Sequence, residues 1–315
     1  MELLCHQYRE FRELLRDVKD VEVLLTCRRV QRAMDVGIPK YTHIRCNTSG
    51  RGASFIVHAL KVNSVVTSLD LSHIDELQDE DASAIAEHLK VNSALVSLRL
   101  TNVSLRSKTG TIIAKALKLN HSLTSLDLSH NFLRDEGASA IAEALEVIHS
   151  LKLLNLKGNN VGNQGAVAIA AALKVNSSLT SLNFSFNLFG KEGLLKIAEA
   201  LKLNSSLTSL DLGGKSLPPE LASVLVNALK QNTSLMSLNL EYSSLAKAPE
   251  IAALMKSNYS LKSLDLSASY LGREGATVIA EWLTVNSCLE SLNIADNSFE
   301  DEGVSAIAEA LKSNS

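Results

Sequence analysis

Aromatic residues and cysteines in paired spacing are scarce in this sequence of 315 residues, and each shortage excludes a kind of structure. Aromatics make up 4% of the chain against 46% hydrophobic residues in total, so a buried core must be aliphatic. The cysteines are four in number and show no CxxC or other ligand spacing. Neither a disulfide framework nor a zinc site is therefore expected. Nucleotide-binding and hydrolase motifs are also missing, so we expect no cofactor and no catalytic residues.

Excess charge of one sign and long apolar runs are missing as well. Lys plus Arg is 31 and Asp plus Glu is 34, which gives a net charge of −3. A nucleic-acid-binding protein normally shows a basic face, so no nucleic-acid partner is expected. No run of about 18 apolar residues predicts a membrane span, and charges interrupt the N-terminus before a signal peptide could form. We expect a monomeric, cytoplasmic protein; secretion into a host cell as an effector stays an alternative.

The sequence does contain one unit of 28 residues, copied about ten times. In the copy at 121–148, Leu123, Leu126, Leu128 and Asn131 give the spacing LxxLxLxxN. Most copies end at an asparagine, a residue that we expect to adopt the left-handed conformation after a helix. The copies run 64–92, 93–120, 121–148, 149–176, 177–204, 205–232, 233–258, 259–286 and 287–314, with a degenerate copy at 36–63.

Each copy predicts a short strand followed by a helix. Leu126 and Leu128 are two residues apart, so both face one side of a strand. The acidic residues of Asp135-Glu136-Gly137 favour a helix start, and an apolar stripe follows at Ala138, Ile141, Ala142 and Leu145. One unit cannot bury this stripe alone, but stacked units can. Because strands stack about 4.8 Å apart and helices about 10 Å apart, the stack should bend into a horseshoe.

The predicted fold is thus an α/β solenoid with a parallel sheet on its concave face and helices on its convex face. The pattern Ser122–Asn131, with Glu136-Gly137-Ala138 after it, resembles the ribonuclease-inhibitor-like leucine-rich repeats over about residues 38–314. That family includes ribonuclease inhibitors, the Ran GTPase activator and NOD-like receptor arrays. The resemblance implies a non-enzymatic scaffold, sensor or effector that holds a protein partner. The alternative is a GTPase-activating protein of the Ran activator type; an inhibitor should be richer in cysteine and more acidic.

Some units depart from the pattern. The asparagine at the position of Asn131 recurs at Asn159, Asn187 and Asn297, but other residues replace it at Ile74, Val103, Lys215, Ser243 and Ser269, with Cys46 in the degenerate copy. Because its side chain should satisfy loop backbone groups, we expect looser loops where it is absent. Prolines at 218, 219 and 249 suit a first helical turn, so these helices should start differently but persist.

Three further segments have two interpretations each. Residues 1–35 carry no repeat and predict a helical cap over the first repeat of the domain 36–315, or else a separate binding helix. Sequons such as Asn176-Ser177-Ser178, which recur at 204 and 232, predict either glycosylation or simple copying of one Asn-Ser-Ser. The acidic stretch Asp75–Asp81 predicts a solvated loop, with partner contact or a calcium site as alternatives.

Strand residues between the leucines should line the concave face in columns. Two columns are nearly uniform, with serine in one and Asp or Asn in the other. The column before the asparagine position varies: His73, Asn102, His130, Gly158, Phe186, Gly214, Tyr242, Ala268 and Asp296. Free variation explains such diversity, and so does recognition of a partner. The histidines are too widely spaced to share a metal. The predicted contact residues are Arg99, His130, Lys157, Phe186, Glu241 and Tyr242.

Overall fold

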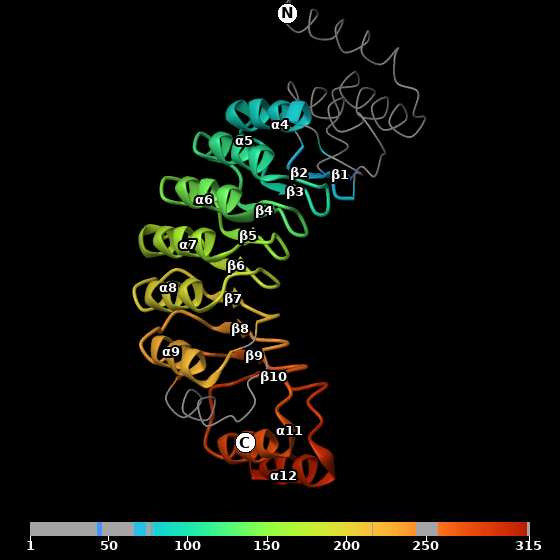
Figure 1. Cartoon of the computed structure of the whole chain (residues 1–315), viewed down its shortest axis with the longest axis vertical. Helices are drawn as coiled ribbons and strands as arrows, with labels where there is room; N and C mark the ends of the chain where they lie inside the picture. The colour runs from blue at the N-terminus through green and yellow to red at the C-terminus, as the bar shows by residue number, and fades with distance from the viewer. Residues whose placement is uncertain are drawn as a thin grey trace, which may run out of the picture. The chain divides into compact units, whose positions relative to one another are not determined.

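The computed structural model describes residues 43–45, 66–73, 77, 79–215, 217–243 and 258–313. The predicted cap at 1–35 and Pro249 lie outside these residues. The chain divides into two compact units, residues 1–155 and 156–315. In each unit a row of short strands lies beside a row of helices, and successive repeats follow one another along the unit (Figure 1).

The first unit holds five parallel strands in chain order. They are β1 His43–Arg45, β2 Ser68–Asp70, β3 Ser97–Arg99, β4 Ser125–Asp127 and β5 Leu153–Asn155, each paired with the next. The helices α4 Asp79–Val91, α5 Ser107–Leu117 and α6 Arg134–Leu145 pack in sequence beside them. The strand β1 confirms that a repeat strand precedes the first regular copy.

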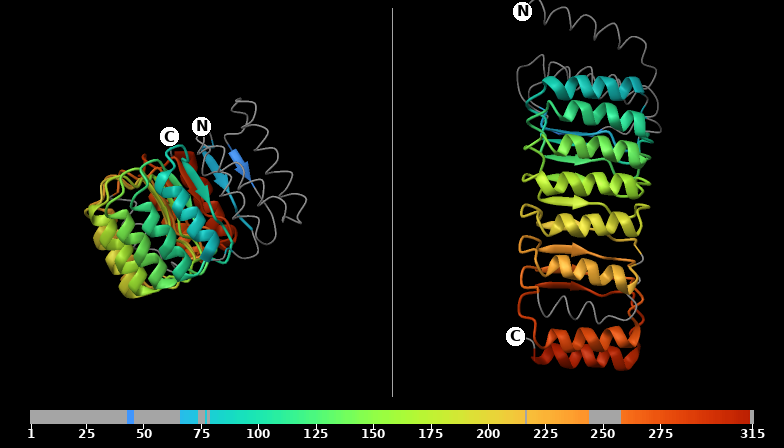
Figure 2. Two further views of the ribbon diagram at one scale, coloured as in Figure 1. Left: turned by 90° about the horizontal axis from the view of Figure 1, so that it is seen from above. Right: turned by 60° about the vertical axis from the view of Figure 1, so that its left-hand side comes forward.

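The second unit repeats this plan. Its strands β6 Ser181–Asn183, β7 Ser209–Asp211, β8 Ser237–Asn239, β9 Ser263–Asp265 and β10 Ser291–Asn293 pair in order and in parallel. Its helices are α7 Asn163–Val175, α8 Lys191–Leu201, α9 Pro219–Leu229, α11 Gly272–Leu283 and α12 Glu300–Ser313. Figure 2 shows the helices of each unit lying side by side with parallel axes.

The core lies between the strand layer and the helix layer of each unit. The central leucine of each strand from β2 to β9 is at most 2% exposed, and the helix stripe predicted from Ala138 to Leu145 is buried likewise. Each fully buried leucine contributes about 1.5–3 kcal/mol, so stacked repeats supply a continuous aliphatic core. The predicted α/β solenoid is confirmed. No helix among the described residues is both long and apolar enough to cross a membrane.

The asparagine at the helix end does not adopt the predicted left-handed conformation. Asn176 follows α7 with φ −73° and ψ 126°, which is extended backbone. Its function comes from the side chain, as Asn204 shows one repeat later: Oδ1 accepts from the backbone N–H groups of Ser206 and Leu207, at 3.1 and 2.8 Å, and Nδ2 donates to the carbonyl of Leu173 at 2.7 Å. These asparagines form a hydrogen-bonded ladder between repeats and are buried at Asn120, Asn176, Asn204, Asn232 and Asn258.

A second asparagine ladder follows the strands, as predicted. Oδ1 of Asn131 accepts from the N–H groups of Val103 and Leu105, and Nδ2 donates to the carbonyls of Leu100 and Leu128, all between 2.8 and 3.1 Å. Every polar atom of the buried side chain is thereby satisfied. Asn159, Asn187 and Asn297 are buried in the same way.

Ser269 and Lys215 take over part of this ladder in two of the repeats that lack the asparagine. The Ser269 hydroxyl accepts from the Ser243 N–H at 3.2 Å and donates to the Leu240 carbonyl at 3.1 Å, so it supplies part of the asparagine pattern. Lys215 donates through Nζ to the carbonyls of Asn187 and Phe189. It offers those loops no acceptor, because an ammonium has none.

The predicted ladder position Cys46 follows β1 but lies outside the described residues, so it stays a prediction.

Two other departures are resolved. The helix α9 begins at Pro219, with the Pro218 carbonyl accepting from the N–H groups of Leu221 and Ala222, so the prolines start the helix as predicted. The acidic stretch is not wholly a solvated loop, because Asp79, Glu80 and Asp81 form the first turn of α4. Asp79 contacts Lys108 at 2.6 Å, and this hydrogen bond lowers the pKa of Asp79.

Candidate functional site

The column of Asp and Asn on the exposed sheet face is explained by bonds within each repeat. Oδ1 of Asp127 accepts from the backbone N–H and the hydroxyl of Ser129, at 3.0 and 2.6 Å. Asp265 with Ser267 repeats this arrangement. The carboxylate or amide thus closes the turn after the strand. The uniformity of this column therefore follows from the fold.

The variable column coincides with a backbone position that the fold holds in the left-handed region. All nine residues of this column have φ between +50° and +74°. In most repeats the N–H of this residue donates to a carbonyl of the next repeat, as Phe186 does to Gly213 at 2.9 Å. Glycine suits this conformation, and Asn, Asp and His tolerate it better than other residues do. This backbone conformation therefore explains why Gly, Asn, Asp and His fill most of the column. The sequence alone did not reveal that conformation.

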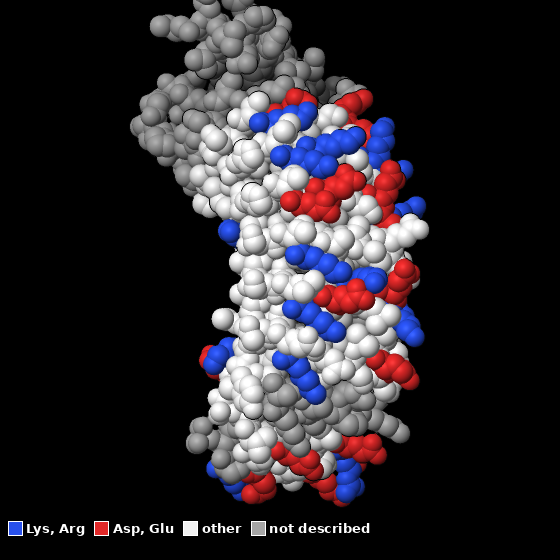
Figure 3. Space-filling model, turned by 90° about the vertical axis from the view of Figure 1, so that its left-hand side faces the viewer, with Lys and Arg blue, Asp and Glu red and all other residues white. Residues whose placement is uncertain are grey.

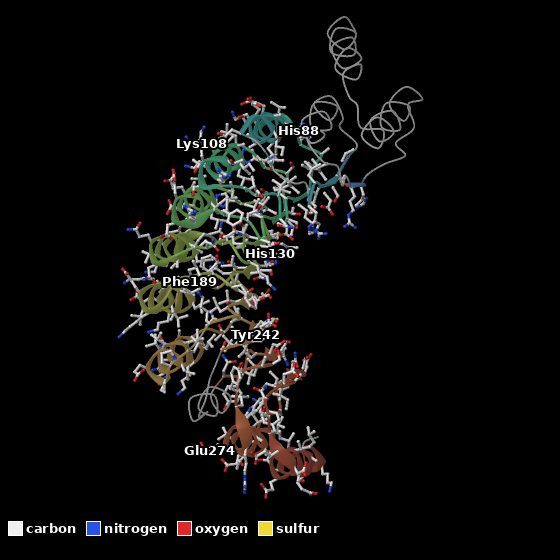
Figure 4. The ribbon with its side chains drawn as sticks, turned by 45° about the vertical axis from the view of Figure 1, so that its right-hand side comes forward. His88, Lys108, His130, Phe189, Tyr242 and Glu274 are labelled. Carbon is white, nitrogen blue, oxygen red and sulfur yellow. The ribbon has the colours of Figure 1, made fainter. Side chains whose placement is uncertain are left out.

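Phe186 and Tyr242 stand out because bulky side chains are disfavoured at such a position, at a cost of about 1 kcal/mol or more each. Both are exposed, at 38% and 53%. Their ring centroids lie 6.0 Å apart at an interplanar angle of 66°, an edge-to-face contact. Figure 4 shows Tyr242 on the strand side of the second unit. The two aromatic residues are two repeats apart in sequence and form one apolar surface.

Gly214 lies between them and makes that contact feasible. A Cβ atom on Gly214 would stand 2.8 Å from Cδ1 and 3.0 Å from Cγ of Phe186, so the ring occupies the space that a side chain would fill. Gly213 plays the same part for Glu241, whose Cγ would lie 2.6 Å from a Cβ there. Two adjacent glycines thus accept the side chains of the repeats on either side.

Charged groups lie beside the aromatic pair. Nζ of Lys157 lies 4.7 Å from the centroid of the Phe186 ring, a cation–π contact. Burial raises the pKa of Asp211, on β7. Burial, followed by repulsion from Asp211, raises the pKa of Glu241. The predicted residues Lys157, Phe186, Glu241 and Tyr242 therefore form one cluster within the second unit.

Arg99 and His130 belong to the first unit, where each has a separate setting. Arg99 lies between two carboxylates, with Nη1 3.7 Å from Asp70 and Nε 3.7 Å from Asp127. Asp70 also forms an ion pair with Arg45, whose Nε lies 3.6 Å from the carboxylate. Arg99 thus places a positive charge between the negative charges of the two neighbouring strands. His130 is exposed at its left-handed position. Their part in binding a partner stays a prediction.

Among the described residues, no group of three or more His, Cys, Asp or Glu side chains could hold a metal ion. His73 is hydrogen bonded to Asn102 at 3.3 Å, across neighbouring repeats. The helix side shows Lys and Arg mixed with Asp and Glu over the helices (Figure 3). Ion pairs such as Lys118–Glu143 and Lys174–Glu199 account for part of this mixture.

Comparison with known proteins identifies the repeat. A family model described as "Leucine Rich repeat" matches residues 62–86, 119–142, 147–170, 175–198 and 285–308. These segments coincide with the repeats that the strands and helices define. The chain is a leucine-rich repeat protein. The ladder asparagines and the helix in each repeat agree with the ribonuclease-inhibitor-like class.

Solved structures share the fold of this leucine-rich repeat protein at low identity. The protein LegL7 from Legionella pneumophila is 19% identical, with 87% of this chain and 98% of that chain covered and a TM-score of 0.54. A chain of the Rad7 and Elc1 complex in yeast is 18% identical, with coverages of 81% and 64% and a TM-score of 0.57. A search of curated proteins found no significant match.

Sequence reasoning missed three members of the cluster: Asp211, Gly213 and Gly214. Asp211 belongs to a column that looked uniform, and Gly214 was one of two glycines in the variable column. The pair Gly213-Gly214 was nevertheless a usable signal. The other described repeats place Ser, Thr, Lys, Glu or Ala at the first of these two positions, where the repeat 205–232 has Gly213.

Proposed function

We propose that this chain is a non-enzymatic protein-interaction module and that it binds a protein partner through the exposed sheet face of its second unit. The interlocking of Phe186, Gly214 and Tyr242 supports this most directly. Gly158 and Gly214 show that glycine satisfies the same backbone position without strain. The fold therefore does not require aromatic residues at these two disfavoured, exposed positions.

Binding a partner gives those residues a physical purpose. Aromatic side chains bury a large apolar area at little cost in conformational entropy, and they dominate many binding hot spots. Lys157 lies against the Phe186 ring, and Glu241 and Asp211 lie beside the adjacent Gly213, an arrangement that resembles the polar rim of an interface. An exposed aromatic pair with charged groups beside it is typical of a protein interface, so a surface built this way suits a protein partner.

The proposal is tested by comparing capture on three proteins. Phe186→Ala combined with Tyr242→Ala should lower recovery of the specific partner about 10-fold or more, since loss of two hot-spot residues costs at least 1–2 kcal/mol. Tyr259→Ala is the control, because Tyr259 is an exposed aromatic residue of the same unit that precedes β9. Equal recovery by the double variant and the control, measured by quantitative mass spectrometry, would move the interface off this surface.

The Ran-activator alternative has a direct test of its own. We expect the purified chain to leave the rate of GTP hydrolysis by Ran unchanged, and acceleration would replace the present proposal. We further propose a monomer in the cytoplasm. The sequon asparagines Asn176, Asn204 and Asn232 are at most 6% exposed, so the folded chain cannot carry glycans there. This supports copying of an Asn-Ser-Ser segment and a location outside the secretory route.

A further inference from the structure

Three carboxylates gather beside the aromatic pair on the second unit. Asp211 and Asp265 lie on β7 and β9, and Glu241 follows β8, the strand between them. Glu241 extends over Gly213 toward Asp211, since a Cβ on Gly213 would lie 2.6 Å from Cγ of Glu241 and 3.3 Å from Oδ1 of Asp211. The absence of a side chain at Gly213 brings the two acidic groups into one small region.

The charge on this part of the sheet face is unbalanced. In the exposed columns of the strands and their following turns, the second unit carries Asp211, Glu241, Asp265 and Asp296 against Lys157, while the Lys215 ammonium of the same turns is held by the Asn187 and Phe189 carbonyls. Lys262, which precedes β9, is already paired with Glu290 at 3.0 Å. Asp211 and Glu241 both interact with Asp265 and with Lys157, so three carboxylates gather near one ammonium group and the aromatic pair adjoins an acidic surface.

The carboxylates also repel one another in the free protein. Burial and the charge of Asp211 both raise the pKa of Glu241, and Asp265 adds to the effect on each of the two groups. Lys157 opposes these effects on both. An additional cation placed here would relieve repulsion that the fold tolerates but does not neutralise.

We propose that the partner presents an arginine from a basic segment to this surface, with the guanidinium against Phe186 and Tyr242 and its N–H groups donating to Asp211 and Glu241. This inference rests on the proposed function and names the chemistry of the partner. Arginine fits better than lysine because its planar group stacks on aromatic rings, is weakly hydrated, and can bridge several acceptors at once.

Lys157 acts as the internal counterpart of that arginine. Its Nζ already lies 4.7 Å from the centroid of the Phe186 ring and interacts with Asp211 and Glu241. An arriving guanidinium therefore competes with Lys157 for the same ring and the same carboxylates. Removing this lysine should strengthen binding of a basic segment and weaken binding of an acidic one. The two kinds of partner thus predict opposite results.

The test uses the full chain with acetylated tetra-arginine amide as the probe, and tetra-glutamate and tetra-lysine as comparisons, with NMR reporting on the Phe186 and Tyr242 rings. We expect tetra-arginine to shift both ring signals and to bind more tightly than tetra-lysine. Tetra-glutamate should bind least. Stronger binding of tetra-glutamate, or no shift of either ring with tetra-arginine, would overturn the inference.

Variants separate this site from general attraction to acidic surfaces. Asp211→Asn and Glu241→Gln should each weaken tetra-arginine binding about 2- to 5-fold, and Lys157→Met should strengthen it by a similar factor. Glu274→Gln, at an exposed carboxylate in the first turn of α11 in the same unit (Figure 4), should leave it unchanged. A loss with Glu274→Gln equal to that with Glu241→Gln would contradict a built site.

Capture of the partner by these variants distinguishes failure of the arginine proposal from failure of the proposed function. If the Phe186→Ala, Tyr242→Ala double variant loses its protein partner while Lys157→Met does not strengthen capture, the interface stands and the arginine does not. If neither the double variant nor Lys157→Met changes capture, both proposals fail.

Discussion

The ring of Phe186 lies directly against the backbone of Gly214, one repeat further along the second unit. A Cβ on Gly214 would stand 2.8 Å from Cδ1 of the ring, closer than carbon atoms approach without displacement. The same glycine has φ +74°, so its conformation and its lack of a side chain are both used. Substituting Gly214 with and without the Phe186 ring therefore tests this contact directly.

Gly214→Ala should destabilise the protein by about 2–3 kcal/mol, of which about 1 kcal/mol is left-handed strain and the rest is displacement of the ring. Gly272→Ala is the matched control, because Gly272 has φ +59° and nothing within 4 Å of an added Cβ. It should lose only the strain part. In a Phe186→Ala background the excess cost of Gly214→Ala should disappear. Urea unfolding measures all four changes, and an excess that persists without the ring would disprove the contact.

Asn204→Ala should cost about 2–4 kcal/mol, because it leaves buried backbone groups of two repeats without partners. The side chain joins Leu173 to Ser206 and Leu207 through three bonds of 2.7 to 3.1 Å. Asn227→Ala, at an exposed position of α9, should change stability by less than about 0.5 kcal/mol. Equal stability of the two variants in urea unfolding would refute the ladder role.

The sequence predicted the repeat well because its information is periodic. Leucines two residues apart fixed the strand faces, and the alanine-rich stripe around Ile141 fixed the buried side of the helix. Such patterns depend on local geometry alone. The asparagine that ends each helix was wrongly assigned to a left-handed backbone, because a residue type shows a preference but not which of its groups is used. Asn204 acts through side-chain bonds to a neighbouring repeat, and sequence spacing does not reveal them.

The candidate site was predictable only in part for a similar reason. Phe186 and Tyr242 were recognisable as exceptions in a chain poor in aromatic residues. Their contact was not predictable, since it needs the left-handed backbone of the column and the missing side chain of Gly214 together. Arg99 was predicted to contact a partner as they were, but in the structure it lies between Asp70 and Asp127. A strand position specifies which face a side chain occupies and leaves its partners open.

Ser269→Ala and Ser243→Ala should differ clearly although both serines stand at the asparagine ladder position and both are fully buried. The Ser269 hydroxyl bonds to groups of Ser243, Leu240 and Ser267, so its removal should cost about 1–3 kcal/mol. The Ser243 hydroxyl makes no hydrogen bond among the described residues, so its removal should be neutral or stabilising. The difference between the two unfolding midpoints checks this, and a reversed order would contradict it.

Lys215 should make stability depend on pH in the alkaline range. Burial lowers its pKa to about 8, while the unfolded chain keeps the usual value of 10.5. Between these values the unfolded state binds more protons, so the contribution of Lys215 to stability rises with pH. Below pH 8 the cost of holding the buried ammonium is fully present. Contact with the Phe189 ring at 3.8 Å offsets part of that cost.

Lys215→Met keeps the length of the side chain and removes the titration. The stability of the wild type minus that of the variant should therefore increase by roughly 1 kcal/mol between pH 7 and pH 10, after discounting for the solvent that reaches this half-buried group. Other lysines and tyrosines titrate equally in both proteins and cancel in the difference. Lys230→Met, at an exposed lysine after α9, should give a curve parallel to the wild type. If the Lys215→Met curve is also parallel, the ammonium is not held at an energetic cost, and its bonds to the Asn187 and Phe189 carbonyls compensate its burial completely.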